Sequence, residues 1–133
     1  MRNPLKTIQE VFVVLDNKPG AVGTLTRTLK KRRIAIYAIG VFGDIARLYV
    51  TRPEKAVAFL AEHGYEAEMR DVIRVDLPNR VGALMDLTCK LGNAGINIDY
   101  LYGAVEQRQK RGVIILDVDK PQLALDIFAT HRF

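Results

Sequence analysis

The sequence predicts an α+β fold made of two similar units, because one pattern of apolar runs, turns and helices occurs twice along the chain. Asn17 and Asn79 begin polar turns at corresponding points of this repeat, and the apolar positions around them correspond as well. A fixed period indicates one supersecondary unit used twice. We therefore expect one unit at residues 1–70 and a second at residues 71–133.

The first copy contains the element order of a complete unit. Its expected elements are strands at residues 8–15, 34–39, 45–50 and 65–69 and helices at residues 21–31 and 53–63. The strands are rich in β-branched and aromatic residues, and the first helix places Val22, Leu25 and Leu29 on one face. Pro53 opens the second helix, where its missing N–H costs nothing. Gly64 suits the left-handed position just after that helix.

The second copy repeats this order up to its last helix. Its expected elements are strands at residues 72–77, 96–102 and 113–118 and helices at residues 83–93 and 121–130. The order strand, helix, strand, strand, helix, strand is that of a ferredoxin-like unit, with two helices on one face of an antiparallel sheet. The sequence ends at Phe133, directly after the last helix, so we expect the second unit to lack its last strand or to have a vestigial one.

The first strands of the two copies differ on the face turned away from the helices. The residues expected to face the helices are Val11, Val13 and Leu15 in the first copy and Ile73, Val75 and Leu77 in the second. On the other face, Phe12 and Val14 stand where the second copy has Arg74 and Asp76. A solvated sheet face should be polar, so the Phe12 and Val14 face is expected to be covered. We predict a homodimer through this face.

Composition indicates a globular protein, with 49% hydrophobic and 26% charged residues. No apolar run is long enough to cross a membrane, and the N-terminal residues lack a signal-peptide core. The single cysteine, Cys89, fits a reducing compartment. We therefore expect a cytoplasmic protein without a membrane partner.

The net charge of +5 raises the question of nucleic acid. Its basic runs, residues 30–33 and 108–111, fall at a helix end and in a hairpin turn, where solvated surface is the simpler interpretation. RNA-binding ferredoxin-like modules stack bases on aromatic side chains of a central strand. Val113 and Ile115 occupy those positions here. RNA binding is kept only as a remote alternative, and no nucleic-acid partner is expected.

No catalytic or metal constellation is expected. His63 and His131 lie at equivalent helix ends, where they suit the helix dipole, and no acid or cysteine cluster accompanies them at metal-ligand spacing. Asp99 with Tyr100 and Tyr102 lacks a nucleophile. We predict a protein that is not an enzyme, with no metal and no cofactor.

The repeated motifs resemble those of the ACT domain family, in particular small proteins made of two tandem ACT domains. The motifs that carry the resemblance are residues 17–20 before Leu25, residues 79–84 before Leu91, residues 94–98, and residues 52–56 at the start of a helix. The resemblance covers roughly residues 8–131. It implies a regulatory, allosteric module that binds a small effector, typically an amino acid, between neighbouring ACT domains.

In the family, a strand-to-helix loop supplies backbone N–H groups and an asparagine, and a strand of the neighbouring domain supplies a second asparagine. Backbone N–H groups at a helix N-terminus suit a carboxylate, and an asparagine amide can both donate and accept. The resemblance implies a main site made of Asn17, Lys18, Pro19, Gly20, Ala21 and Val22 with Asn97, Ile98, Asp99 and Tyr100. It implies a weaker second site at Asn79, Arg80, Val81, Gly82, Ala83 and Leu84.

The two sites are expected to differ because the copies differ. Val81 replaces the family's usual proline, Ala35 stands where the second copy has Asn97, and Tyr37 stands where it has Asp99. The predicted function is a non-catalytic, amino-acid-sensing regulatory protein. The alternative is a regulatory subunit of a separate amino-acid biosynthetic enzyme, similar to the small subunit of acetolactate synthase.

Overall fold

The computed structural model describes residues 2–133 and has the expected α+β fold. The strands in these residues are β1 (Leu5–Val14), β2 (Ile36–Phe42), β3 (Ile45–Val50), β4 (Ala67–Pro78), β5 (Ile98–Ala104) and β6 (Arg111–Val118). The helices are α1 (Ala21–Lys31), α2 (Pro53–Glu62), α3 (Ala83–Asn93) and α4 (Pro121–Ile127). Hydrogen bonding joins the strands in the order β2-β3-β1-β4-β6-β5. The ferredoxin-like expectation is confirmed.

The chain divides into two compact units, and β1 and β4 each contribute to both. The first unit is Gln9–Asp71, and the second is Val72–Phe133 together with the N-terminal segment through Ile8. This division differs from the expected units, residues 1–70 and 71–133, in the placement of that N-terminal segment.

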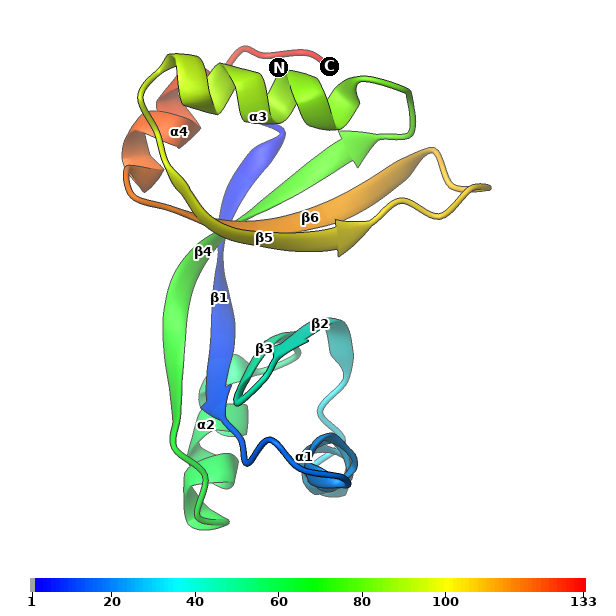
Figure 1. The fold of residues 1–133 in the computed structure, drawn as a ribbon, viewed down its shortest axis with the longest axis vertical. Coiled ribbons are helices and arrows are strands. Elements are labelled where there is room, and N and C mark those ends of the chain that lie inside the picture. Colours follow the sequence, from blue (N-terminus) through cyan, green and yellow to red (C-terminus); the bar gives the residue numbers. More distant parts are fainter. Residues whose placement is uncertain (1) are drawn as a thin grey trace. The chain divides into compact units, whose positions relative to one another are not determined.

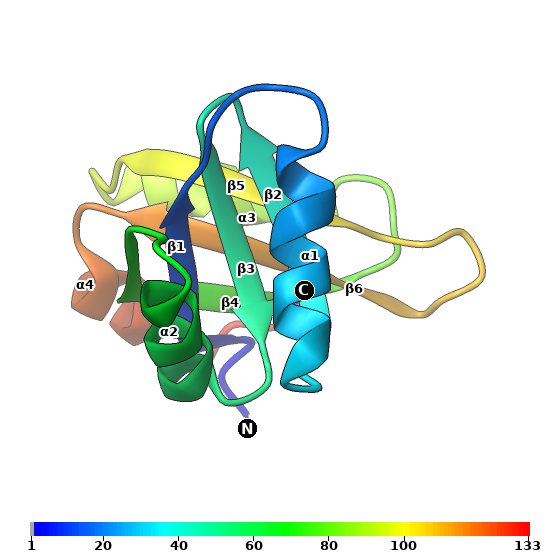
Figure 2. The ribbon, with the colours of Figure 1, turned by 90° about the horizontal axis from the view of Figure 1, so that it is seen from below.

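In the first unit, α1 and α2 cover one face of β1, β2 and β3 (Figure 2). Strand β3 pairs antiparallel with β1, Val13 opposite Ala46, and with β2 on its other side. The core between helices and sheet contains Val11, Val13, Leu15, Leu25, Leu29, Ile34, Ala46, Leu48, Val50, Ala56 and Leu60. Alternate residues of β1 therefore face the helices, as the apolar pattern predicted.

In the second unit, α3 and α4 pack on one face of the sheet formed by β4, β5 and β6 (Figure 1). Strand β6 pairs antiparallel with β4, Ile73 opposite Leu116, and with β5. The core contains Leu5, Ile73, Val75, Leu77, Ala83, Leu87, Leu91, Ile96, Ile114, Leu116, Val118, Ala124 and Phe128. Leu5 is the member that comes from outside the second copy of the repeat.

The beginning of β1 occupies the place of the last strand that the second copy lacks. The N–H of Asp76 donates to the carbonyl oxygen of Pro4 (3.1 Å), and the Asn3 amide donates to the carbonyl oxygen of Leu125 (2.9 Å). Leu5 is 2% exposed. An unpaired sheet edge is a liability that proteins cover, and here the chain covers it with its own N-terminal residues.

Several element boundaries also differ from expectation, among them those of β4, β2 and α4. Strand β4 runs without a break through Asp71, where the sequence predicted two separate strands. Strand β2 begins at Ile36, because the N–H of Ile34 still closes the end of α1 by donating to Leu29 (3.2 Å). Helix α4 ends at Ile127 rather than at residue 130. None of the helices in residues 2–133 is both long and apolar enough to span a membrane.

The outer face around Phe12 is covered in part by side chains of the first unit itself. The guanidinium carbon of Arg70 lies 3.9 Å from the centre of the Phe12 ring, and that of Arg47 lies 5.2 Å away. Glu10 is 0% exposed and forms an ion pair with Arg47 (3.2 Å). Cations over an aromatic face are stabilising. Part of the cover that the sequence led us to expect over Phe12 therefore comes from the same unit. The homodimer through Phe12 and Val14 remains a prediction.

Candidate ligand-binding site

The loop between β1 and α1 ends in a tight turn that only glycine adopts without strain. Gly20 caps α1 in the left-handed conformation, with φ 87°, a region that costs other residues steric strain. The N–H of Ala21 donates to the carbonyl oxygen of Lys18 (3.3 Å), and that of Thr24 donates to Gly20 (2.9 Å). The turn thus delivers the chain directly into the first turn of the helix.

The N-terminus of α1 has the character of an anion site. The N–H groups of Val22 and Gly23 lie in the first helical turn, which has no acceptor in the preceding helix. Within residues 2–133 no side chain caps this end, and the first turn carries no acidic residue. Such N–H groups, with the positive end of the helix dipole, favour a bound carboxylate.

A cavity of about 520 Å³ adjoins this loop. Its walls come from the end of β1, the loop, and the turn between α2 and β4; they are residues 14–16, 18–21, 24 and 63–66. Of the residues predicted from the sequence, the structure brings Lys18, Pro19, Gly20 and Ala21 to this cavity. Asn17 and Val22 belong to the same loop and are exposed, without lining the cavity.

The wall formed by residues 63–66 was missed in the sequence reasoning. It lies beside the loop because β4 neighbours β1, and the N–H of Val14 donates to the carbonyl oxygen of Glu66 (3.0 Å). The available signal was the ferredoxin-like order itself, which places the start of the last strand beside the end of the first. His63 belongs to this wall, and its Nδ1 hydrogen-bonds the Phe59 carbonyl oxygen (3.0 Å).

The second loop has the same backbone form but different side-chain contacts. Gly82 caps α3 with φ 91°. The Asn79 amide donates to the carbonyl oxygens of Gln109 (2.9 Å) and Gln107 (3.2 Å), so it holds the turn between β5 and β6. Asp86, in the first turn of α3, forms an ion pair with Arg80 (2.7 Å).

The remaining residues of the second loop range from buried to fully exposed. Ala83 is 1% exposed in the core, whereas Val81 is 101% and Leu84 46% exposed. The N-terminus of α3 has a carboxylate of its own, that of Asp86, and the Asn79 amide is already hydrogen-bonded. This contrasts with Asn17, for which residues 2–133 show no side-chain hydrogen bond.

Asn97 immediately precedes β5, which corrects its expected position inside a strand. Its amide donates to the Asp99 carboxylate (3.0 Å), and its backbone N–H donates to Asp119 (2.9 Å). Ala35 makes the matching backbone bond to the Thr51 hydroxyl in the first unit (3.0 Å). The two copies therefore share this backbone hydrogen bond, but only the second copy has an amide side chain, that of Asn97, at this position.

Ile98, Asp99 and Tyr100 have three different environments. Ile98 packs against the core of the second unit, Asp99 is exposed, and the Tyr100 ring lies 6.3 Å from that of Tyr102, centre to centre. The residues 97–100 belong to the second unit and the residues 17–22 to the first. Their association in one site stays a prediction.

His131 does not have the environment of the cation that was predicted to suit the helix dipole. Burial, followed by the nearby Lys90 ammonium, lowers the pKa of His131 below its usual 6.5. The Lys90 ammonium donates to its Nδ1 (3.0 Å), which fits a neutral ring rather than a cation at a helix end. In residues 2–133 no group of three or more His, Cys, Asp or Glu side chains is arranged to hold a metal ion.

Comparison with known proteins gives one family and several similar folds. The family model for an ACT domain pair matches residues 6–132. No curated protein sequence gives a significant match. A solved protein from Bacteroides thetaiotaomicron is similar with a TM-score of 0.83 and 23% identity, over 93% of this chain and 88% of that chain.

Two further similar structures are regulatory subunits of aspartate kinase. The subunit from Thermus thermophilus, solved without ligand, has a TM-score of 0.69 and 17% identity, over 96% of this chain and 97% of that chain. The subunit from Thermus flavus has a TM-score of 0.64 and 21% identity, over 92% and 93% of the two chains. At these identities the likeness shows a shared fold.

Proposed function

The chain belongs to the ACT domain pair family, and from that premise we propose that it is a regulatory protein that binds a free amino acid at the loop between β1 and α1. The observation that carries the proposal is the uncapped N-terminus of α1, with exposed Asn17 beside it and a cavity of about 520 Å³ adjoining the loop. The family membership confirms the resemblance first drawn from the sequence motifs.

An amino acid offers three groups to be recognised. Its carboxylate suits the N–H groups of Val22 and Gly23, which lack acceptors in the helix. The Asn17 amide can donate to the carboxylate or accept from the ammonium group. A cavity of this size is within the range of small-molecule sites, so the effector's side chain has room beside the loop.

We propose, on the sequence argument, that Asn97 and Asp99 supply the partners of the ammonium group. Their exposure and their mutual hydrogen bond (3.0 Å) support the proposal, because an exposed amide–carboxylate pair is available to a cation. Asn97→Ala should then weaken effector binding. Asp119→Asn is the matched control, because it changes the charge of a side chain next to Asn97 while keeping that side chain's size.

The second loop should bind an amino acid weakly or not at all. Asp86 would repel a carboxylate at the N-terminus of α3, and Arg80 is already paired with it (2.7 Å). The Asn79 amide holds the hairpin between β5 and β6. These contacts support the predicted inequality of the two sites with a cause beyond the differences at Ala35 and Tyr37.

A second candidate function is that of a separate regulatory subunit for an amino-acid biosynthetic enzyme. The specific observation in its favour is that the chain matches 97% of the length of the aspartate kinase regulatory subunit from Thermus thermophilus. That match favours an aspartate-kinase-like partner over the acetolactate synthase type first considered. Co-purification of the tagged chain with such an enzyme, and a change of its activity by the effector, would support this function.

A thermal-shift screen with the twenty common amino acids tests the proposal. A ligand that binds only the folded state raises the melting temperature, so at least one amino acid should raise it in a concentration-dependent way. The same amino acid should lose most of its effect on Asn17→Ala. A screen in which no amino acid changes the melting temperature contradicts the proposal.

A further inference from the structure

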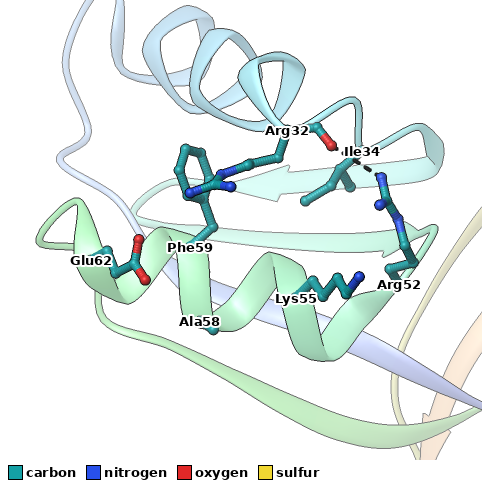
Figure 3. A pocket seen from close by; sticks show the side chains of 7 residues that line it. All are labelled: Arg32, Ile34, Arg52, Lys55, Ala58, Phe59 and Glu62. Atoms are coloured by element: carbon teal, nitrogen blue, oxygen red, sulfur yellow. Dashed lines mark hydrogen bonds between the residues drawn. The ribbon is translucent and has the colours of Figure 1, made fainter.

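A second cavity of the first unit lies between the end of α1 and the outer side of α2. Its volume is about 400 Å³, and its lining residues are Arg32, Ile34, Arg52, Lys55, Ala58, Phe59 and Glu62 (Figure 3). It shares no lining residue with the cavity at the β1–α1 loop. We call it the α1–α2 pocket.

Three cations and one carboxylate line the α1–α2 pocket. Arg32, Arg52 and Lys55 form no ion pair with a carboxylate within residues 2–133, and Glu62 is the acidic lining residue. The guanidinium carbon of Arg32 lies 4.5 Å from the centre of the Phe59 ring, which holds that side chain over the apolar floor. The lining therefore carries more positive than negative charge, with three cations against one carboxylate.

Arg52 has a structural reason to be where it is. Its Nη2 donates to the carbonyl oxygens of Arg32 (3.0 Å) and Arg33 (3.1 Å), just beyond the end of α1. Lys120 precedes α4 as Arg52 precedes α2, and its ammonium donates to the carbonyl oxygen of Gly95 (2.8 Å), just beyond α3. Both copies of the repeat thus use a cation to satisfy the carbonyl groups at this helix end.

Arg32 and Lys55 have no such structural reason. The corresponding residues of the second copy are Ala94 and Leu123, both uncharged, and that copy forms the same fold. Arg32 is the C-cap of α1, next to a last turn in which Lys30 and Lys31 already complement the helix dipole. Two cations that the second copy of the fold does without therefore converge on a cavity, together with Arg52, whose counterpart Lys120 is also a cation.

We propose that the α1–α2 pocket binds a small phosphorylated molecule. A cluster of three cations facing one carboxylate matches a multivalent anion better than a monovalent one. Arginine forks fit phosphate oxygens bidentately, and lysine adds a point charge. The apolar wall of Ile34, Ala58 and Phe59 can receive the organic part of the molecule. The site is independent of the amino-acid site proposed above, and it gives the chain a second effector.

Titration calorimetry with inorganic pyrophosphate, in a buffer of physiological chloride concentration, tests this proposal. The full chain should bind about one pyrophosphate saturably, whereas acetate should give no signal. Arg32→Ala and Lys55→Leu each introduce the residue that the second copy carries, so both variants should fold. Each removes a charge-assisted contact and should weaken pyrophosphate binding about tenfold or more.

Lys31→Ala is the matched control, because Lys31 is an exposed cation of the same helix end that does not line the pocket. It should change the affinity less than about twofold, since screened surface charges contribute little. Equal weakening by Lys31→Ala, or no saturable binding by the unmodified chain, overturns the proposal. Neither pocket variant should change the amino-acid response at the β1–α1 loop, so the two proposals can fail separately.

Discussion

Leu5→Ala should destabilise the second unit, because Leu5 places an N-terminal side chain in the core of a unit whose other core residues all come from Val72–Phe133. The side chain is 2% exposed, so its removal leaves a cavity beside β4 rather than a solvated gap. Fully buried leucine-to-alanine changes cost about 2–5 kcal/mol. We expect a cost in the lower part of this range, about 2–3 kcal/mol.

Native-state hydrogen exchange is the assay that separates the two units. The backbone amides of β6 should lose protection by an amount equivalent to about 2–3 kcal/mol, because local stability sets exchange. The amides of β3, in the first unit, should change little. Lys6→Ala is the control: Lys6 is exposed on the same strand and should shift stability by less than about 0.5 kcal/mol.

A loss of protection below about 0.5 kcal/mol in β6 would refute the reasoning. It would mean that the N-terminal residues merely lie along the edge and that the second unit is stable without them. A loss spread equally over β3 and β6 would also refute it, since the contacts of Leu5 belong to the second unit alone.

Three further predictions follow from single contacts. Gly103→Ala should prevent normal pairing of β5 with β6, because a Cβ there would overlap the carbonyl oxygen of Val113, and circular dichroism should show a strongly lowered melting temperature. If the outer face of β1 is a dimer interface, Phe12→Arg should give monomers, as measured by light scattering. An unchanged mass would mean that Arg47 and Arg70, and not a second chain, cover that face. The folded chain holds the pKa of His131 below its usual 6.5, so the contribution of His131 to the free energy of unfolding should be complete above about pH 6.5 and should decline as the pH falls below that value. His131→Gln should reduce this decline. A urea midpoint that is the same at pH 7.5 and pH 5.5 would contradict the prediction.

The elements that depend on local signals were predictable from the sequence. Helix α1 begins after Gly20 and α3 after Gly82, and both helices match the expected bounds, because turn, capping glycine and apolar spacing lie within a few residues of one another. The same holds for β3, between a short turn and Pro53.

The beginning of β1, from Leu5 to Thr7, was not predictable, because its pairing is non-local. Leu5-Lys6-Thr7 has no strong strand pattern, and the whole first unit separates Pro4 from its partner Asp76 in the sequence. Chain order predicted that the second unit lacks its last strand, but not which segment takes that strand's place. Hydrogen-bond pairing depends instead on which segment can reach the open edge.

The candidate site was predictable in its loop and less so in its surroundings. The repeat gave the residues of the β1–α1 loop, whereas the wall at His63 required knowledge of strand order. The repeat gave Asn17 and Asn79 corresponding positions, and the predicted difference between the two sites rested on other residues, Ala35, Tyr37 and Val81. The longer turn between β5 and β6 gives Asn79 carbonyl partners that Asn17 does not have, and residue correspondence alone does not show such a difference.

Calorimetry with the amino acid that most raises the melting temperature tests the central claim most directly. We expect about one binding site per chain. Asn17→Ala should weaken binding about tenfold or more, because a hydrogen bond to a charged group contributes roughly 1.5–3 kcal/mol. Asn79→Ala should loosen the β5–β6 hairpin and leave the affinity unchanged. Two equal sites per chain, or loss of binding in Asn79→Ala with Asn17→Ala unaffected, would contradict the assignment of the effector to the β1–α1 loop.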